Sequence, residues 1–394
     1  MARIVKTARR GLFVIIIGVS SGLVAQTLPP GWKGTIENRE GVRIIKNPAG
    51  PLHGEVTLEL EKDLVIGDDQ DEHSLFYYKT SIRVDRPGNI FVWDPNSFRI
   101  QMFDKTGKFV RTIGKKGEGP GEFMDAFQLK FLLDGMGRLY VRDNAKIHVF
   151  SSEGRFERSI PAAASGGRNF AVLLDGAILR DGWAFEKDRM KEIVVLTDGE
   201  GKILKTVAGF PSQRFEVQMK EKPRFTVYYP ELIVSPWTAA AALFGLPSAY
   251  RLTAVDGRGE TGMIIEKEEA PVRTTPREKA KIIDEFLSGN RKASRSELEN
   301  QKLLPEFWPF FDALLADDKG RIFVQRTKNI LDEAPGTAFD VFSREGFYLY
   351  RANAAEDVCL AIADGFLYSR KYNREKECDQ VFRYRIRNWE DLKY

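Results

Sequence analysis

The segment DRPGNIFV at residues 85–92 decides the fold, because the chain repeats it as DGMGRLYV at residues 134–141. The two copies start 49 residues apart, and each is followed by a matching pair of short runs. These runs are FRIQMFD and GKFVR in the first copy, and KIHVF and GRFER in the second. Each copy is therefore a series of short strands and turns. A repeat of this length is typical of a β-propeller blade, since one four-stranded sheet cannot bury both of its faces alone.

The residue types inside each copy support short strands joined by tight turns. Ile90–Trp93 and Leu139–Val141 are β-branched or aromatic runs, which favour strands. The turns before them carry Asp and Gly, which tolerate the tight backbone between antiparallel strands. Apolar and polar residues alternate over Ile100–Met102 and Ile147–Val149, which predicts strands with one apolar face.

Four further copies are weaker or incomplete. The third opens near residue 174, the fourth is degraded over residues 231–260, and the fifth is clear again from Asp317. The sixth opens at Asp364 and ends without a fourth strand. We expect residues 54–60 to supply that strand, because pairing the two ends of the chain closes the ring and removes exposed sheet edges. The sequence thus predicts an all-β fold, a six-bladed β-propeller closed by an N-terminal strand added to the last blade.

The repeats resemble NHL-type repeats, and their order is similar to that of the exported bacterial six-bladed β-propeller family. The resemblance covers residues 54–388 and includes the connector at 114–123, the segment 271–276 and the closing segment 382–386. It implies a propeller over nearly the whole mature chain. It implies no catalytic residue, because the family is defined by its architecture and most members have no assigned activity.

The repeats leave two N-terminal segments and one insertion. Residues 1–25 combine a basic stretch, an apolar run and a small residue at the end, which is typical of a cleaved secretory signal. Their apolar run is too short for an ordinary transmembrane helix. We therefore expect a periplasmic or secreted protein without a transmembrane span after cleavage; an uncleaved anchor is the alternative. Residues 26–53 form an extension before the propeller at 54–394, and a capping box at 275–278 predicts a helical insertion at about 275–304, between blades 4 and 5.

The charge balance argues against a nucleic-acid partner. The chain has 60 Lys and Arg against 56 Asp and Glu, a net charge of +4. The predicted signal holds four basic and no acidic residues, so the mature chain is neutral. Nucleic-acid binding usually requires a basic face. We expect instead a monomer that binds a protein partner or a small polar or anionic ligand in the cell envelope.

Few residues offer metal or catalytic chemistry. His53, His73 and His148 are the only histidines, and their spacing fits no metal site, so we predict none. His148 alternates with apolar neighbours and is expected to face solvent. The acidic run at 68–72 lacks the glycine and spacing of an EF-hand calcium loop, so calcium binding is an open alternative and not a prediction. We predict no other cofactor. Residues 114–121 lack the spacing of a phosphate-binding loop and are interpreted as a blade connector.

The two cysteines lie in the predicted last blade. A pair of cysteines in an exported protein favours a disulfide. Cys359 belongs to the first strand of that blade and Cys378 leads into the third, and such strands lie about 9–10 Å apart. The bond requires the loop at 372–377 to fold over, so the sequence does not decide whether Cys359 and Cys378 form a disulfide.

One face of the predicted ring carries every long insertion, including residues 207–230 and 266–305. Loops on a rigid scaffold concentrate binding residues, so we expect this connector face to be the working face. Residues that close the second strands are predicted to ring the channel mouth there: Trp93, Asp94, Arg142, Asp143, Arg180, Gln325, Arg326, Arg370 and Lys371. Their mixture of Arg and Asp suits a polar or anionic ligand.

The sequence favours a non-catalytic binding or interaction scaffold that presents these loops. The alternative is a metal-dependent propeller hydrolase or lyase that acts on a sugar, lactone or peptide at the central channel. Such an enzyme needs inward-pointing acids, amides or histidines from several blades. The expected inner strands at 81–84, 128–132 and 313–316 offer few acids and no His, which weighs against the enzyme.

Overall fold

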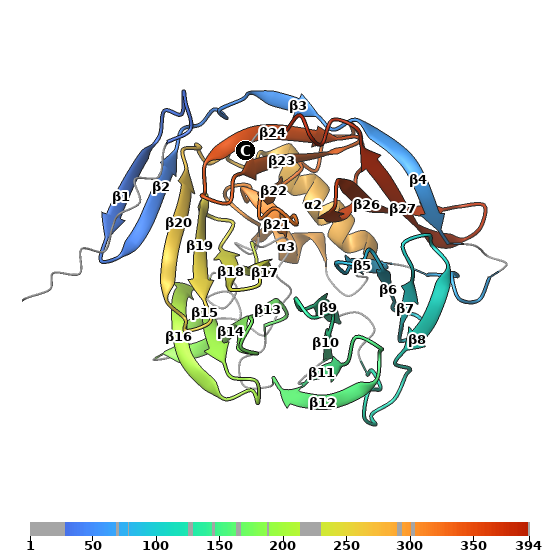
Figure 1. Cartoon of the computed structure of the whole chain (residues 1–394). Helices are drawn as coiled ribbons and strands as arrows, with labels where there is room; N and C mark the ends of the chain where they lie inside the picture. Colours follow the sequence, from blue (N-terminus) through green and yellow to red (C-terminus); the bar gives the residue numbers. More distant parts are fainter. Residues whose placement is uncertain are drawn as a thin grey trace, which may run out of the picture. The chain divides into compact units, whose positions relative to one another are not determined.

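The computed structural model describes residues 28–67, 71–77, 79–124, 129–143, 146–162, 167–186, 189–212, 230–289, 294–300 and 304–392. The chain divides into two compact units, residues 1–32 and 33–394. The second unit is a six-bladed β-propeller in which six sheets form a ring (Figure 1). The predicted signal at 1–25 lies outside the described residues. Within the described part of the chain, no helix is long and apolar enough to cross a membrane.

The first three blades are four-stranded antiparallel sheets whose strands follow the chain from the inside of the ring to the outside. Blade 1 consists of β5 (Ser81–Val84), β6 (Ile90–Asp94), β7 (Arg99–Phe103) and β8 (Phe109–Ile113). Blade 2 consists of β9 (Lys130–Leu133), β10 (Leu139–Asp143), β11 (Lys146–Phe150) and β12 (Phe156–Pro161). Blade 3 consists of β13 (Phe170–Val172), β14 (Ile178–Glu186), β15 (Arg189–Thr197) and β16 (Ile203–Pro211).

The last three blades use the same order and add strands from the N-terminal part of the chain. Blade 4 consists of β17 (Ile233–Thr238), β18 (Ala241–Gly245), β19 (Arg251–Asp256) and β20 (Thr261–Lys267). Blade 5 consists of β21 (Phe311–Ala316), β22 (Ile322–Arg326), β23 (Thr337–Phe342) and β24 (Tyr348–Ala354). Blade 6 consists of β25 (Cys359–Ala363), β26 (Phe366–Asn373), β27 (Cys378–Ile386) and, outermost, β4 (Leu60–Ile66).

An N-terminal strand closes the ring on the last blade, as predicted, but that strand is β4 and not residues 54–60. β4 pairs antiparallel with β27, with Leu60 opposite Ile386. The predicted segment instead contributes β3 (Glu55–Thr57), which pairs in parallel with β24 of blade 5. β3 has one apolar residue, Val56, and β4 has apolar residues on either side of the polar run Glu61–Asp63, so the pattern alone does not decide which strand meets which blade edge.

The extension before the repeats also forms strands. β1 (Thr35–Arg39) and β2 (Val42–Asn47) make a hairpin, and β2 pairs in parallel with β20, which gives blade 4 six strands. Asn47 is buried, donates to the Gly346 carbonyl at 2.9 Å and accepts from the Tyr348 N–H at 2.8 Å. The N-terminal strands therefore cover the outer edges of blades 4, 5 and 6.

The repeated Asp explains why the same short string recurs in the sequence. In each clear copy its carboxylate accepts both the backbone N–H and the side-chain N–H of the residue four positions later. The side-chain bonds join Asp85 to Asn89 at 2.8 Å, Asp134 to Arg138 at 2.8 Å and Asp317 to Arg321 at 2.6 Å. The glycine of this turn has a positive φ, 91° at Gly88, which favours a residue without a Cβ. The string therefore fixes the turn between the first two strands of a blade.

Apolar side chains pack between neighbouring blades, and one of them comes from a connector. Phe123 of the connector at 114–123 is fully buried between blades 1 and 2, edge-on to Trp93 at 5.6 Å. A Cβ on Gly114 would lie 2.1 Å from the Phe123 ring, so this position requires glycine. The Glu122 carboxylate accepts the Gly119 N–H at 2.9 Å and pairs with Lys115 at 3.1 Å. The Gly- and Lys-rich segment is thus a blade connector, as predicted, that closes on its own carboxylate.

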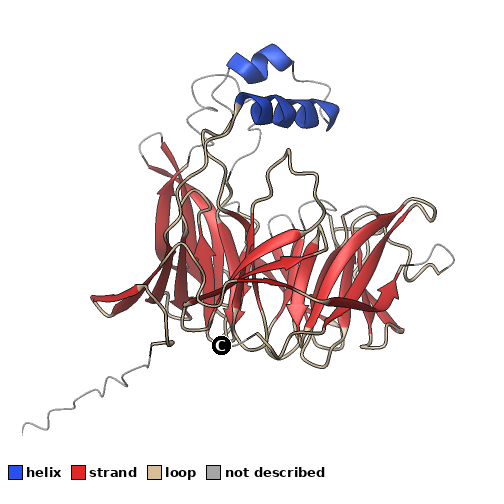
Figure 2. Cartoon of the chain, turned by 90° about the horizontal axis from the view of Figure 1, so that it is seen from above, coloured by secondary structure: helices blue, strands red, loops and turns tan. Residues whose placement is uncertain are grey.

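A helical insertion separates β20 from β21, as predicted. It contains α2 (Pro276–Gly289) and α3 (Arg295–Asn300), which lie on one face of the ring (Figure 2). The capping box is present, because Thr275 N–H donates to the Glu278 carboxylate at 2.6 Å and Glu278 N–H donates to Thr275 Oγ1 at 3.3 Å. The helices share a small apolar core of their own, made by Ile282, Ile283, Leu298 and Trp308.

Candidate functional site

The topology places the start of every inner strand on the connector face. Each connector returns from the outside of one blade to the inner strand of the next, and the helical insertion lies on the same face (Figure 2). The inner strands are β5, β9, β13, β17, β21 and β25. Their first residues are therefore the side chains that an incoming ligand meets first.

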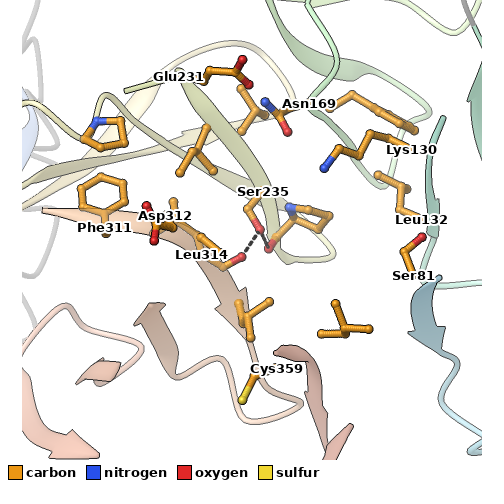
Figure 3. Close-up of a pocket in the computed structure, with 18 of the residues that line it drawn as sticks. Ser81, Lys130, Leu132, Asn169, Glu231, Ser235, Phe311, Asp312, Leu314 and Cys359 are labelled. Carbon is orange, nitrogen blue, oxygen red and sulfur yellow. Dashed lines mark hydrogen bonds between the residues drawn. The ribbon is translucent and has the colours of Figure 1, made fainter. Parts of the chain in front are cut away.

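A cavity of 630 Å³ lies among the inner strands of all six blades (Figure 3). This volume falls within the range of small-molecule sites. Many of its lining residues lie within two positions of the start of an inner strand: Ser81, Lys130, Asn169, Phe170, Glu231, Phe311, Asp312 and Cys359. The cavity therefore lies toward the connector face of the channel.

Most of the residues that line the cavity are apolar, although polar and apolar atoms contribute about equally to its surface. The apolar residues include Phe131, Leu132, Phe170, Ile233, Val234, Phe311, Leu314, Leu360 and four prolines at 230, 236, 247 and 309. The Ser235 hydroxyl donates to the Leu314 carbonyl at 2.9 Å and joins β17 to β21 inside the ring (Figure 3). A proline-rich, cross-bonded wall of this kind changes shape little when a ligand enters.

Arg83 and Lys130 form a positively charged wall on blades 1 and 2. The Arg83 guanidinium donates to the Ile82 carbonyl at 2.7 Å and lies 5.7 Å from the centre of the Phe131 ring. The Lys130 side chain extends into the cavity (Figure 3). Burial first, and then the charge of Arg83, lowers the pKa of Lys130, and burial lowers the pKa of Arg83. In the described part of the chain, neither cation lies within 4.0 Å of a carboxylate oxygen.

Glu231 and Asp312 form an acidic wall on blades 4 and 5, on the other side of the ring (Figures 1 and 3). The Asp312 carboxylate accepts the Thr327 hydroxyl at 2.8 Å, and burial raises its pKa. The Glu231 charge acts on Lys130 and raises the pKa of the ammonium, which partly opposes the effect of burial. The cavity thus combines an apolar body with charges of opposite sign on two walls.

None of the nine residues predicted at the channel mouth lines this cavity. Trp93 belongs to the core between blades 1 and 2, and Asp94 is fully buried and pairs with Arg99 at 3.2 Å. Arg142, Asp143 and Arg180 are also buried. The Asp143 carboxylate accepts the Met124 N–H at 2.7 Å, and Arg180 donates to the Ala162 carbonyl at 3.1 Å.

The other four predicted residues lie on blades 5 and 6, and three of them have structural partners. Gln325 is half-buried on β22. Arg326 pairs with Glu269 and, at 2.8 Å, with Asp340. Arg370 donates to the Thr80 carbonyl at 3.3 Å, and Lys371 pairs with Glu356 at 2.8 Å. All nine come from second strands, which lie about 5 Å farther from the channel than the first strands, so they meet neighbouring blades and not the opening.

The structure does bring Arg142 and Arg180 together around an acid that the sequence did not single out. Asp181 is buried and accepts the backbone N–H and side-chain amide of Asn169 at 2.9 and 3.0 Å. Burial raises the pKa of Asp181 to about 6, although the bonds from Asn169 and the charge of Arg142 oppose this shift. Since Asn169 also lines the cavity, this cluster lies directly behind the cavity wall.

One further sequence prediction needs correction. His148 does not face solvent: it is buried, its Nδ1 lies 3.0 Å from Ser159 Oγ, and its ring packs near Phe123. Cys359 and Cys378, whose pairing the sequence left open, form no disulfide with each other in this structure, where β26 lies between their strands. Burial raises the pKa of Cys359, in the cavity wall, to about 12. Among the described residues, no group of three or more His, Cys, Asp or Glu side chains is placed to hold a metal ion.

Comparison with known proteins agrees with the fold. Residues 71–134 match a family model described as a 6-bladed beta-propeller, and no curated protein matches the sequence. A candidate exported protein from Bacteroides fragilis is similar in structure, with a TM-score of 0.56, 15% identity, and coverage of 87% of this chain and 99% of that one. A DUF4221 family member from Bacteroides vulgatus gives a TM-score of 0.49, 12% identity and coverage of 83% and 98%. Virginiamycin B lyase from Staphylococcus aureus gives a TM-score of 0.41 and 10% identity, with coverage of 83% of this chain and 99% of that one. At 15% identity, the likeness to the Bacteroides fragilis protein shows a shared fold and nothing of the activity.

Proposed function

We propose that this protein is an extracytoplasmic, non-catalytic binding protein that takes a small polar or anionic ligand into the cavity from the connector face. The cavity itself carries the proposal: it is a pocket of 630 Å³ that is lined mostly by apolar residues and has several charged groups on its walls. Pockets of this composition are typical of small-ligand sites. The signal-like segment at residues 1–25 supports export to the periplasm or beyond, and the Asp-x-x-Gly turns support NHL-like repeats.

The connector face also offers a surface for a protein partner. The helical insertion is fastened to the loop between β22 and β23, because Asn329 donates to Glu278 and Ile330 packs on the apolar core of the helices. This raised surface stands on the same face as the cavity-lining strand starts (Figure 2). It supports a scaffold that presents bound ligand or its own loops to a partner.

A metal-dependent hydrolase or lyase is the alternative function. The observation in its favour is Asp312, a cavity carboxyl whose pKa burial raises, since general acids often have raised pKa values. Such an enzyme would consume the ligand, whereas a binding protein returns it unchanged.

A thermal-shift screen followed by calorimetry of residues 26–394 tests the proposal. The panel contains divalent metals, sugars, organic acids and peptides. A ligand at a hundredfold excess over its Kd adds about 2.7 kcal/mol of stability. A stabilising ligand that is recovered unchanged supports the binding protein. Turnover that depends on an added metal supports the enzyme, and no response to any small molecule contradicts a small-ligand site.

A further inference from the structure

Arg83 and Lys130 differ from Lys267 and Arg326 in their ion pairs. Lys267 and Arg326 both pair with Asp340, at 3.0 and 2.8 Å. Among the described residues, no carboxylate oxygen lies within 4.0 Å of Arg83, which is half-buried, or of Lys130, which is exposed at the cavity surface. The two cations lie on neighbouring inner strands, near enough for the charge of Arg83 to add to burial in lowering the pKa of Lys130, while the charge of Glu231 opposes this shift. Two like charges this close repel each other, which disfavours the empty cavity.

A bound anion would offset this destabilisation. The Arg83 guanidinium lies over the Phe131 ring at 5.7 Å and uses one nitrogen for the Ile82 carbonyl, so the ring and this bond restrict its orientation. Guanidinium binds a carboxylate through two parallel hydrogen bonds, and an ammonium adds a point charge. The pair is therefore suited to a single carboxylate.

The opposite wall selects against ligands that are anionic at both ends. Glu231 and Asp312 line the cavity there, and a second anionic group beside them would be repelled. An ammonium or another hydrogen-bond donor would be attracted. Between the two walls the lining is apolar, with Leu132, Ile233 and Leu314 available to an aliphatic or aromatic side chain.

From these contacts, and resting on the binding function proposed above, we propose that the ligand is a small zwitterion, an amino acid or a short peptide. Its carboxylate binds Arg83 and Lys130, its ammonium faces Glu231 and Asp312, and its apolar part occupies the body of the cavity. The charges on the two walls set the direction in which the ligand lies.

Calorimetric titration with matched probes tests this assignment on the unmodified protein, residues 26–394. The probes are leucine and the dipeptide Leu-Leu, each with both ends free, with the amino end acetylated, or with the carboxyl end as an amide. We expect one of the two free forms to bind, and its amide and its acetylated form to bind about tenfold more weakly or worse. An amide or an acetylated form that binds as tightly as the free zwitterion overturns the proposal.

Variants locate the binding on the named residues. Lys130→Met and Arg83→Gln should each weaken binding of the free zwitterion about tenfold or more, and Asp312→Asn should weaken the zwitterion but not the acetylated probe. The exposed residues of the same type, in Lys62→Met and Arg86→Gln, are controls and should leave binding unchanged.

The outcomes separate this inference from the proposed function. If a sugar or another non-zwitterion binds, and Lys130→Met does not weaken it, the zwitterion is wrong while the binding function stands. If none of the probes and no member of the wider panel binds, both are wrong.

Discussion

Two charged regions of the propeller use the same kinds of side chain in opposite ways. Between blades 4 and 5, Asp340 is fully buried and accepts Tyr250 Oη at 2.6 Å, Tyr348 Oη at 2.5 Å, Lys267 Nζ at 3.0 Å, Arg326 Nη1 at 2.8 Å and Arg351 Nε at 3.1 Å. In the channel wall, Arg83 and Lys130 line a cavity, and within the described residues no carboxylate oxygen lies within 4.0 Å of either. The charges of the Asp340 region are paired without a ligand, and those of Arg83 and Lys130 are not paired in this way.

The difference shows how a charge that belongs to the fold can be told from one that belongs to a site. Burial alone would raise the pKa of Asp340, but Lys267 and Arg326 hold it well below the ordinary value for a carboxyl. The pKa of Lys130 is lowered by burial and by Arg83, and the nearby acids do not reverse the shift. Because Lys130 is exposed at the cavity surface and Arg83 is half-buried, both cations remain accessible to a bound anion.

The Asp340 cluster also occupies a repeated position, which supports a structural role. In blade 1, Gln101 accepts from Thr112 at 2.6 Å, and in blade 2, His148 lies 3.0 Å from Ser159. Each pair joins the middle of the third strand to the fourth strand, in the same register as Asp340 and Arg351. The propeller therefore uses this position for a polar contact between its outer strands.

The largest expected effect is the loss of the Asp340 carboxylate. Asp340→Ala leaves Lys267 and Arg326 buried without this partner and should lower the free energy of unfolding by about 3–5 kcal/mol. Urea denaturation followed by circular dichroism measures it, with the exposed residue change Asp391→Ala as the control. A loss below about 1 kcal/mol would show that the paired charges do not hold blades 4 and 5 together.

Asp181 gives an intermediate case, a buried acid beside the cavity that is only partly neutralised. Its pKa is raised to about 6, against about 3.9 in an unfolded chain, so the folded state holds the proton more tightly. Its contribution to stability is full below pH 4 and is lost as the pH rises to about 6, by up to about 3 kcal/mol. Facing groups are Asn169, Arg142, Arg180 and Lys130.

Asp181→Asn should remove this pH dependence. The difference in unfolding free energy between the variant and the unchanged protein should therefore shift in favour of the variant between pH 4.5 and pH 7.5. Denaturant titrations at the two pH values provide the measurement. The same difference at both values would mean that Asp181 is as well neutralised as Asp340.

A smaller effect is expected where no charge is in question. Thr275→Ala removes the N-cap of α2 and should destabilise the helical insertion by about 1 kcal/mol, while Thr275→Ser keeps the cap and should change little. The rate of amide hydrogen exchange over residues 276–289 measures this loss of stability. Protection that is equal in the two variants would show that the packing of Ile282 and Trp308, and not the cap, sets the stability of the helices.

The sequence predicts the fold well because the repeat has a physical cause in every copy. Asp85, Asp134 and Asp317 each fix a turn through local hydrogen bonds, and local bonds leave a clear pattern in the chain. The closing strand was misplaced, since the residue patterns of β3 and β4 do not mark their partners and only the path of the chain separates them. His148 was misplaced because strand alternation does not show that both faces of a blade are covered.

The site was harder to predict than the fold. Strand ends indicated the correct face for Asp94 and Arg180, but not their distance from the channel, which depends on the position of each strand within its blade. The useful signal was present near the starts of the inner strands, at Lys130 and Asp312. It could not be read as a site, because opposite charges from blades 2 and 5 meet only when the ring closes.

The measurement that tests the central claim most directly is the stability of Lys130→Met without ligand. If Lys130 serves a ligand, removing its unneutralised charge should leave the free energy of unfolding within about 0.5 kcal/mol of the unchanged protein, or raise it, as for the exposed control Lys62→Met. A loss of more than about 1 kcal/mol, comparable to breaking a structural contact, would place Lys130 with the charges that hold the fold and contradict the account.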